Sequence, residues 1–419
     1  PLVEKDLNPW AVGCYTSQIR IKQKHRQLEG ELALVEKMLS QAEVRGLLAY
    51  PENELEQAVK ALLFCEFHDI LPGTSIAPVE EMSLATLDGG LAIVNRLKQR
   101  AFFALLAGEK KAEEGEYPIF FYNPHPHPEE SDFTCEFQLA NQNWTDRYAM
   151  PEIFQDGSPL PFQVEKESCN MNLDWRKRVT FHAVLKPACM NRFSVRIRML
   201  DPAEKEKTLM PKRGVKHDAA GESMIFETEE LRVEISKRTG LLNAYRVDGR
   251  DYLEPGAGAL VVMKTDCDPW GMNRHSYREE RGRFTLLPRE EGSRYSGVSN
   301  ERHAGDGVLL DSLRIVEQGE VRTVVEAVFG YGNSRACIRY LIPAKGKALE
   351  MQVHVDWMEK GSLLKLEFLT CLRESVPYTE TAYGVNTHMP DGEEKVMHGF
   401  CVYLKAQEKS RRLYCSYRS

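Results

Sequence analysis

The sequence predicts an α+β protein of several domains, an antiparallel three-helix bundle followed by antiparallel β-sandwich (supersandwich) domains. Over about the first hundred residues apolar positions recur every three to four residues, the period of an amphipathic helix. After Gly115 apolar and polar residues alternate one by one, the period of a half-buried strand. The chain of 419 residues is also too long for one compact core.

Three helices are expected before Gly115. The first covers residues 17–40, the second runs from about 53 to 67, and the third follows Pro78, a residue suited to a first helical turn. The pair Gly89-Gly90 weakens the third helix at mid-length by about 1 kcal/mol per glycine. Helices joined by such short connections pack as a bundle.

The strands are expected where small groups of residues alternate in polarity, at 133–139, 179–185, 193–197, 231–235, 349–357 and 364–368. Turn signals such as Asp156-Gly157 and Asp248-Gly249 separate these runs, as in β-sandwiches built from hairpins. Residues 201–222 are polar and aperiodic, which predicts a linker or a long loop. We therefore expect the bundle in residues 1–112, a first small β domain in 113–205, and a large β-sandwich in 206–419.

Composition excludes some functions. The net charge of -7, without a basic cluster, argues against a nucleic-acid partner. No apolar run approaches the roughly 18 residues that cross a bilayer, so no membrane partner is expected. The ten cysteines form no CxxC pair, and several lie in apolar runs, which favours reduced thiols in a cytoplasmic protein. Because the chain begins at Pro1, we expect a fragment of a longer protein.

The most informative segment is HDILPGTS, residues 68–75, where the second predicted helix ends. Adjacent residues of a helix face different ways, so His68 and Asp69 should make two different contacts. A neutral imidazole is a good zinc ligand, and a carboxylate can accept hydrogen bonds from a sugar hydroxyl. A helix cap or a surface pair is the alternative.

This segment resembles the His-Asp-x-x-x-Gly-Thr/Ser signature of glycoside hydrolase family 38, the class II α-mannosidases. A second segment, GCYTS at residues 13–17, is similar to the Gly-Cys-Tyr-Ser/Thr segment that opens the first bundle helix of that family. The order of the two segments, the helices and the β region also matches. The resemblance is strongest over residues 6–110 and architectural afterwards, where the large β-sandwich is mutarotase-like.

The resemblance implies a zinc-dependent retaining exo-α-mannosidase that acts on terminal α-D-mannosyl residues of an oligosaccharide or glycoside. It implies His68 as a Zn²⁺ ligand, Asp69 as a contact of the bound mannose, and Asp6 as the candidate acid/base. The nucleophilic aspartate and the other zinc ligands of the family lie in an N-terminal α/β barrel, and we expect this chain to begin after it. The loop that contains Asp268 and Trp270 resembles an Asp/Trp-rich loop of some members, which makes both residues candidates for substrate binding; an ordinary surface turn is the alternative. A homo-oligomer is compatible with this assignment.

Retaining glycosidases need two carboxyl groups about 5 Å apart, and a catalytic zinc needs about three protein ligands. We therefore expect this polypeptide alone to be inactive and to bind zinc only weakly. Two weaker signals concern histidines. His125 and His127 lie in a proline-rich stretch that we interpret as an extended connector, and His354 and Asp356 should share the solvated face of a strand.

Two other functions are considered. A non-catalytic carbohydrate-binding or scaffold module would leave the His-Asp pair as a helix cap buried in the bundle. A sugar epimerase would need a pair of catalytic groups within the β region, and none is identified. The exposure of His68 and Asp69 distinguishes the first of these from a mannosidase.

Overall fold

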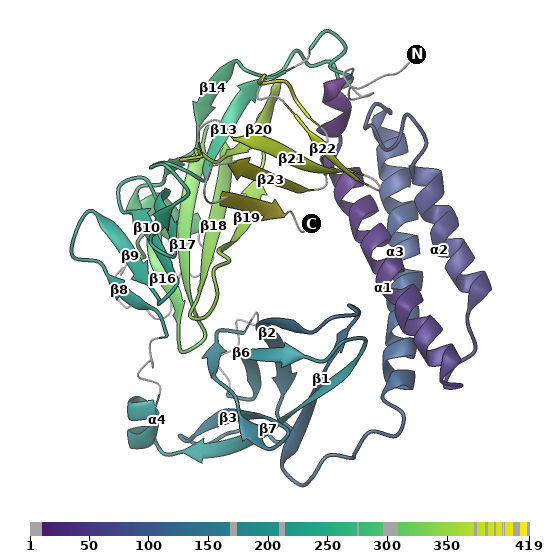
Figure 1. The fold of residues 1–419 in the computed structure, drawn as a ribbon, viewed down its shortest axis with the longest axis vertical. Coiled ribbons are helices and arrows are strands. Elements are labelled where there is room, and N and C mark those ends of the chain that lie inside the picture. Colours follow the sequence, from purple (N-terminus) through teal and green to yellow (C-terminus); the bar gives the residue numbers. More distant parts are fainter. Residues whose placement is uncertain are drawn as a thin grey trace.

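The computed structural model describes residues 11–167, 174–208, 214–274, 276–295, 309–372, 375–381, 384–388, 391–395, 397, 399–404 and 411–416. Within these residues a bundle of three long helices precedes a series of antiparallel sheets, as predicted (Figure 1). In Figure 1 the three long helices lie side by side along one edge, the β unit that contains β1, β2, β3, β6 and β7 lies below, and the green and yellow strands lie above it.

The bundle consists of α1 (Ile19–Val44), α2 (Glu52–Cys65) and α3 (Ala77–Leu105), preceded by a short 3-10 helix, η1 (Val12–Tyr15). The apolar positions of the predicted stripes are buried, among them Leu28, Val35, Leu87 and Val94. Helix α3 continues through Gly89-Gly90, and a Cβ on Gly90 would lie 2.8 Å from a methyl carbon of Leu28. Gly90 therefore lets α1 and α3 approach closely, which offsets its low helix propensity.

The first β unit is a sandwich of two sheets. One has the order β1-β7-β3-β4 and the other the order β2-β6-β5. Phenylalanine rings fill the space between them, with Phe121, Phe133, Phe181 and Phe193 in mutual contact. The strands are β1 (Glu116–Asn123), β2 (Glu129–Gln138), β3 (Tyr148–Gln155), β4 (Ser158–Pro159), β5 (Phe162–Glu165), β6 (Arg176–Leu185) and β7 (Cys189–Leu200).

The stretch expected to be an aperiodic linker holds regular structure instead. Helix α4 (Pro202–Thr208) begins at a proline with Glu204 in its first turn, a favourable helix start. Strand β8 (Lys216–Asp218) then pairs with β9 (Ser223–Glu227). Neither element is long enough to show a period in the sequence, so the expectation of a linker was wrong for these residues.

The large β region buries one extended core, in which Phe226, Ile235, Phe329 and Tyr340 are almost fully enclosed. Its sheets have the orders β12-β11-β10-β9-β8, β14-β13-β20, β15-β17-β18-β19 with β16 beside β17, and β22-β21-β23-β24. The further elements are β10 (Leu231–Ser236), β11 (Leu242–Val247), β12 (Arg250–Asp251), β13 (Ala259–Lys264), β14 (Glu280–Arg283), β15 (Thr285–Leu286), α5 (Arg289–Tyr295), β16 (Leu313–Gln318), β17 (Arg322–Tyr331), β18 (Ser334–Pro343), β19 (Glu350–Asp356), β20 (Ser362–Glu367), β21 (Val376–Thr381), β22 (Gly384–Thr387), β23 (Gly399–Leu404) and β24 (Arg411–Ser416).

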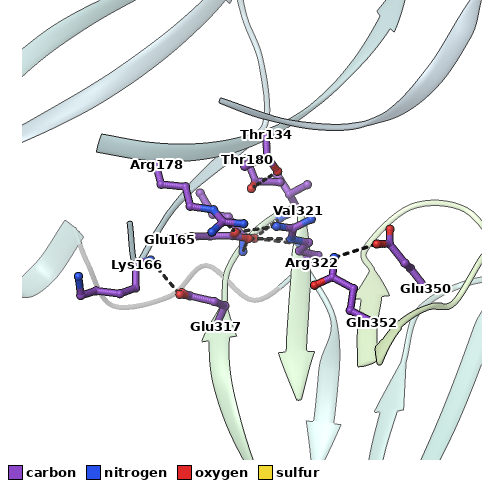
Figure 2. A network of polar contacts seen from close by, with 11 residues as sticks. Thr134, Glu165, Lys166, Arg178, Thr180, Glu317, Val321, Arg322, Glu350 and Gln352 are labelled. Carbon is purple, nitrogen blue, oxygen red and sulfur yellow. Dashed lines mark hydrogen bonds and ion pairs between the residues drawn. The ribbon is translucent and has the colours of Figure 1, made fainter. Parts of the chain in front are cut away.

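A buried polar network joins the first β unit to the large β region (Figure 2). The guanidinium of Arg322 donates two hydrogen bonds to the carboxylate of Glu165, at 2.7 and 2.6 Å. The side-chain oxygen of Gln163 accepts hydrogen bonds from the backbone N–H groups of Val321 and Arg322. The carboxylate of Glu317 accepts one from the backbone N–H of Lys166, at 2.8 Å. Burial raises the pKa of Glu317 to about 7.

Among the residues that the structure describes, no helix has the length and apolar character needed to cross a membrane.

Candidate functional site

The predicted motif forms a compact turn at the end of α2. The helix ends at Cys65, two residues before the predicted end, and the chain then turns through residues 66–75. The backbone N–H of Ile70 donates to the carbonyl of Phe67, and that of Gly73 donates to the carbonyl of Ile70. The Ile70 side chain is buried in the bundle core. This anchor fixes the turn to the bundle and leaves its outer side open.

His68 projects from the outer side of this turn, with 76% of its side chain exposed. Its ring packs against that of Phe67, and its Nε2 lies 3.5 Å from the Asp69 carboxylate. Asp69 is 45% exposed and accepts a 3.2 Å hydrogen bond from the Thr74 hydroxyl. The Ser75 hydroxyl donates to the backbone carbonyl of Asp69. The Thr-Ser end of the motif therefore orients Asp69, and the imidazole remains available to a ligand.

Two residues of α1 and its N-terminal turn hold the motif from the other side. The Lys22 ammonium donates to the carbonyl oxygens of Ser17 and Leu71, the latter at 2.8 Å. The Gln18 amide donates to the carbonyl of Ser75 at 2.7 Å. Gly73 has a φ of +76°, and a Cβ there would lie 2.2 Å from the Ser17 carbonyl oxygen. Glycine is therefore required at this position of the motif.

The loop with the candidate residues Asp268 and Trp270 packs against the same N-terminal turn. The backbone N–H of Gly13 donates to the Trp270 carbonyl at 3.0 Å, and the Ser17 hydroxyl donates to the Pro269 carbonyl at 2.7 Å. Contact is so close that a Cβ on Gly13 would lie 2.7 Å from the backbone nitrogen of Gly271. Three segments that are distant in sequence therefore meet around residues 13–18. Sequence reasoning missed this contact, for which the only signal was a glycine on each side.

Within that loop the Asp268 carboxylate has local partners. Its two oxygens accept hydrogen bonds from the backbone N–H groups of Trp270, at 3.0 Å, and Met272, at 3.1 Å. Trp270 is half-buried. Asp268 thus shapes the loop that presents Trp270. Its predicted role in substrate binding stays a prediction, as does that of Trp270.

The described residues contain no group of three or more His, Cys, Asp or Glu side chains that could hold a metal ion. The exposed ring of His68 offers one nitrogen donor, with Asp69 beside it, and a catalytic zinc needs about three protein ligands. His68 thus fits the part of a single ligand in a site completed by other residues. The candidate acid/base Asp6 lies outside the described residues.

The weaker histidine signals lie away from this turn. The rings of His125 and His127 stack with their centroids 5.3 Å apart, and His127 faces the carbonyl of Pro128. His354 on β19 is 76% exposed and lies 3.5 Å from Asp356, so the two share a solvated strand face as predicted. Free thiols are found at Cys14, Cys65, Cys135, Cys189, Cys267 and Cys337.

The described residues thus combine a three-helix bundle that bears an exposed His-Asp turn with a series of β-sandwiches. Residues 10–105, which end with α3, match the family model of the alpha mannosidase middle domain. Human Alpha-mannosidase 2C1 is 33% identical over 102 residues, which are 24% of this chain and 10% of the human protein. The predicted resemblance to α-mannosidases is therefore confirmed for the helical bundle.

Two solved structures share the fold of nearly the whole chain. An α-mannosidase from Enterococcus faecalis V583 matches with a TM-score of 0.71 and 12% identity, over 99% of this chain and 50% of that chain. A protein in glycosyl hydrolase family 38 from Enterococcus faecalis matches with a TM-score of 0.68 and 11% identity, over 96% of this chain and 53% of that chain. The predicted fold class is confirmed, and the chain spans about half the length of these structures.

Proposed function

We propose that these 419 residues are part of a zinc-dependent retaining exo-α-mannosidase that hydrolyses terminal α-D-mannosyl residues. One observation carries the proposal: the exposed His68-Asp69 turn lies within the segment that matches the alpha mannosidase middle domain. A carbohydrate-binding or scaffold module would instead have this pair enclosed in the bundle as a helix cap, and both side chains are exposed.

In the proposed site His68 supplies one zinc ligand through a ring nitrogen. Bound zinc would act as a template and a Lewis acid for sugar hydroxyls. Asp69, oriented by Thr74, would accept a hydrogen bond from a hydroxyl of the terminal mannose. Trp270 would offer an aromatic face to the sugar, and Asp6 would serve as the acid/base. The nucleophile and the other zinc ligands would come from polypeptide beyond these residues.

A cytoplasmic location is part of this proposal. Free thiols persist in a reducing compartment, and Cys14, Cys65, Cys135, Cys189, Cys267 and Cys337 are free thiols.

The proposal is tested by comparing this chain with the full natural protein that contains it. The full protein should hydrolyse an aryl α-D-mannoside, lose activity with a chelator, and recover it with zinc. The 419-residue chain alone should show no turnover and no stoichiometric zinc after dialysis. A full protein without α-mannosidase activity, or clear turnover by the chain alone, would contradict the proposal.

A further inference from the structure

The three segments that meet near the His68 turn share an unusual backbone. Six described residues other than glycine have a left-handed φ. Three of them, Asp156, Ala188 and Asp248, lie in tight turns between consecutive strands, where this conformation is common. The remaining three, Ala11, Gln18 and Cys267, all lie in or beside the segments that meet here. Strained backbone gathers at functional sites when the surrounding structure holds it in place.

The same junction, residues 11–18 with 67–75 and 266–271, contains an unsatisfied polar atom. The side-chain oxygen of Gln18 is buried and has no hydrogen-bond partner among the described residues, although its amide donates to Ser75. Such groups are rare in native proteins, and each needs an explanation. Strain and an unpaired acceptor together indicate that the geometry of this junction serves more than stability.

Lys22 lies at the centre of this junction. Its ammonium bridges the carbonyls of Ser17, in the N-terminal turn, and Leu71, in the turn that bears His68. Burial lowers the pKa of Lys22 to about 8, which reflects how far its charge is withdrawn from water. Within the described residues no carboxylate lies within ion-pair distance of Lys22, whereas Lys24 on the same helix pairs with Asp88. Withdrawing a cation from water costs free energy, and here only neutral carbonyl oxygens offset that cost.

We propose that Lys22 is the positioning residue of the His68-Asp69 turn. Ile70 anchors the turn from inside the bundle. Lys22 holds the turn through the carbonyl of Leu71, three residues after His68. Because Lys22 also holds Ser17, whose hydroxyl bonds Pro269, it sets the place of the imidazole relative to the loop that presents Trp270. Lys22 touches neither metal nor sugar in this account and acts through the turn. The importance of the His68 placement for catalysis rests on the proposed function. The hydrogen bonds by which Lys22 places His68 do not depend on that function.

The test uses the 419-residue chain without metal or substrate, so it does not depend on the mannosidase proposal. The protein is labelled with ¹³C-histidine, and the imidazole signal of His68 is assigned by its loss in His68→Gln. Lys22→Met keeps the length of the side chain and removes the ammonium. It should shift the His68 signal and speed amide exchange in residues 70–75 by roughly tenfold or more, since a charge-assisted bond is lost. Exchange within α3 should stay unchanged.

Lys24→Met is the matched control, because it removes from the same helix an ammonium that pairs with Asp88, and it should leave the His68 signal in place. Lys22→Arg keeps a cation that can reach both carbonyls and should restore much of the native signal. If Lys22→Met fails to fold, Lys22→Gln takes its place, because it also removes the charge and keeps a polar side chain. A merely structural lysine would change exchange throughout the bundle and leave the His68 signal unmoved. An unmoved His68 signal in folded Lys22→Met or Lys22→Gln, or exchange raised equally in all three helices, would overturn the proposal.

Discussion

Glu317 allows a quantitative test of the interface between the two β regions. Its carboxylate accepts the backbone N–H of Lys166 and is shielded from water, which raises its pKa from an ordinary 4.5 to about 7. Glu165 adds to this increase, while Arg178 and Arg322 oppose it. Each pKa unit corresponds to about 1.4 kcal/mol, so burying the ionised carboxylate costs up to about 3 kcal/mol.

The sign of the effect follows from proton linkage. Between the unfolded pKa near 4.5 and the folded pKa near 7, the native state holds the Glu317 proton and the unfolded state has lost it. The stability contributed by protonated Glu317 is therefore fully present below its unfolded-state pKa. This stability is lost as the pH rises through its folded-state pKa. Glu317→Gln stays neutral and keeps an acceptor for Lys166. It should match the wild type near pH 4.5 and exceed it by about 2–3 kcal/mol at pH 8.

The assay is urea unfolding of both proteins between pH 4.5 and 8, followed through the transition that involves the β regions. Glu320→Gln is the control, because Glu320 follows Glu317 by three residues, in the connection between β16 and β17, and is exposed. The two stability curves should separate only as the pH rises for Glu317→Gln, and should stay parallel for the control. A Glu317→Gln variant that is less stable than the wild type at pH 8, or equally different at every pH, would refute the reasoning.

Further predictions concern packing. Gly73→Ala should destabilise the bundle by more than about 2 kcal/mol, because the φ of residue 73 is positive and a Cβ there would meet Ser17. Gly89→Ala, the control, should be neutral or stabilising by up to about 1 kcal/mol. Thermal melts of the two variants measure the difference. Glu165→Ala should lower the free energy of unfolding by about 3–5 kcal/mol, because it leaves the Arg322 guanidinium buried without its partner. Urea unfolding should show almost no change for Glu350→Ala, the control at an exposed residue. Equal effects within either pair would contradict the assigned packing.

The sequence predicted the elements whose period extends over several turns or residue pairs. The three helices and the longer strands, such as residues 179–185 and 231–235, have a regular apolar pattern because one face of each is buried. Short elements could not be predicted this way. Strand β5 has four residues and helix α4 has seven, too few to establish a period. The predicted domain boundaries at 112/113 and 205/206 stay a prediction.

The sequence predicted the motif of residues 68–75 but did not predict its assembly with residues 13–18 and 266–271. The turn was expected from Pro72-Gly73, although α2 already ends at Cys65, and the exposure of His68 was left open by the sequence and is given by the structure. The contact of residues 13–17 with residues 269–271 joins positions about 250 apart, and no local period encodes it. In the sequence, Lys22 is one of several charged residues in the first predicted helix. Only the fold shows that its ammonium is enclosed by carbonyl oxygens.

The most direct test of the central claim is the zinc content and α-mannosidase activity of the full natural protein carrying His68→Gln. His25→Gln is the matched control, because His25 contacts Glu66 at the start of the same turn, with 3.0 Å between the ring nitrogen and the carboxylate. Loss of a zinc ligand should lower kcat/KM by at least roughly 100-fold and reduce bound zinc, while the control keeps both. Full activity and full zinc content in His68→Gln would contradict the account.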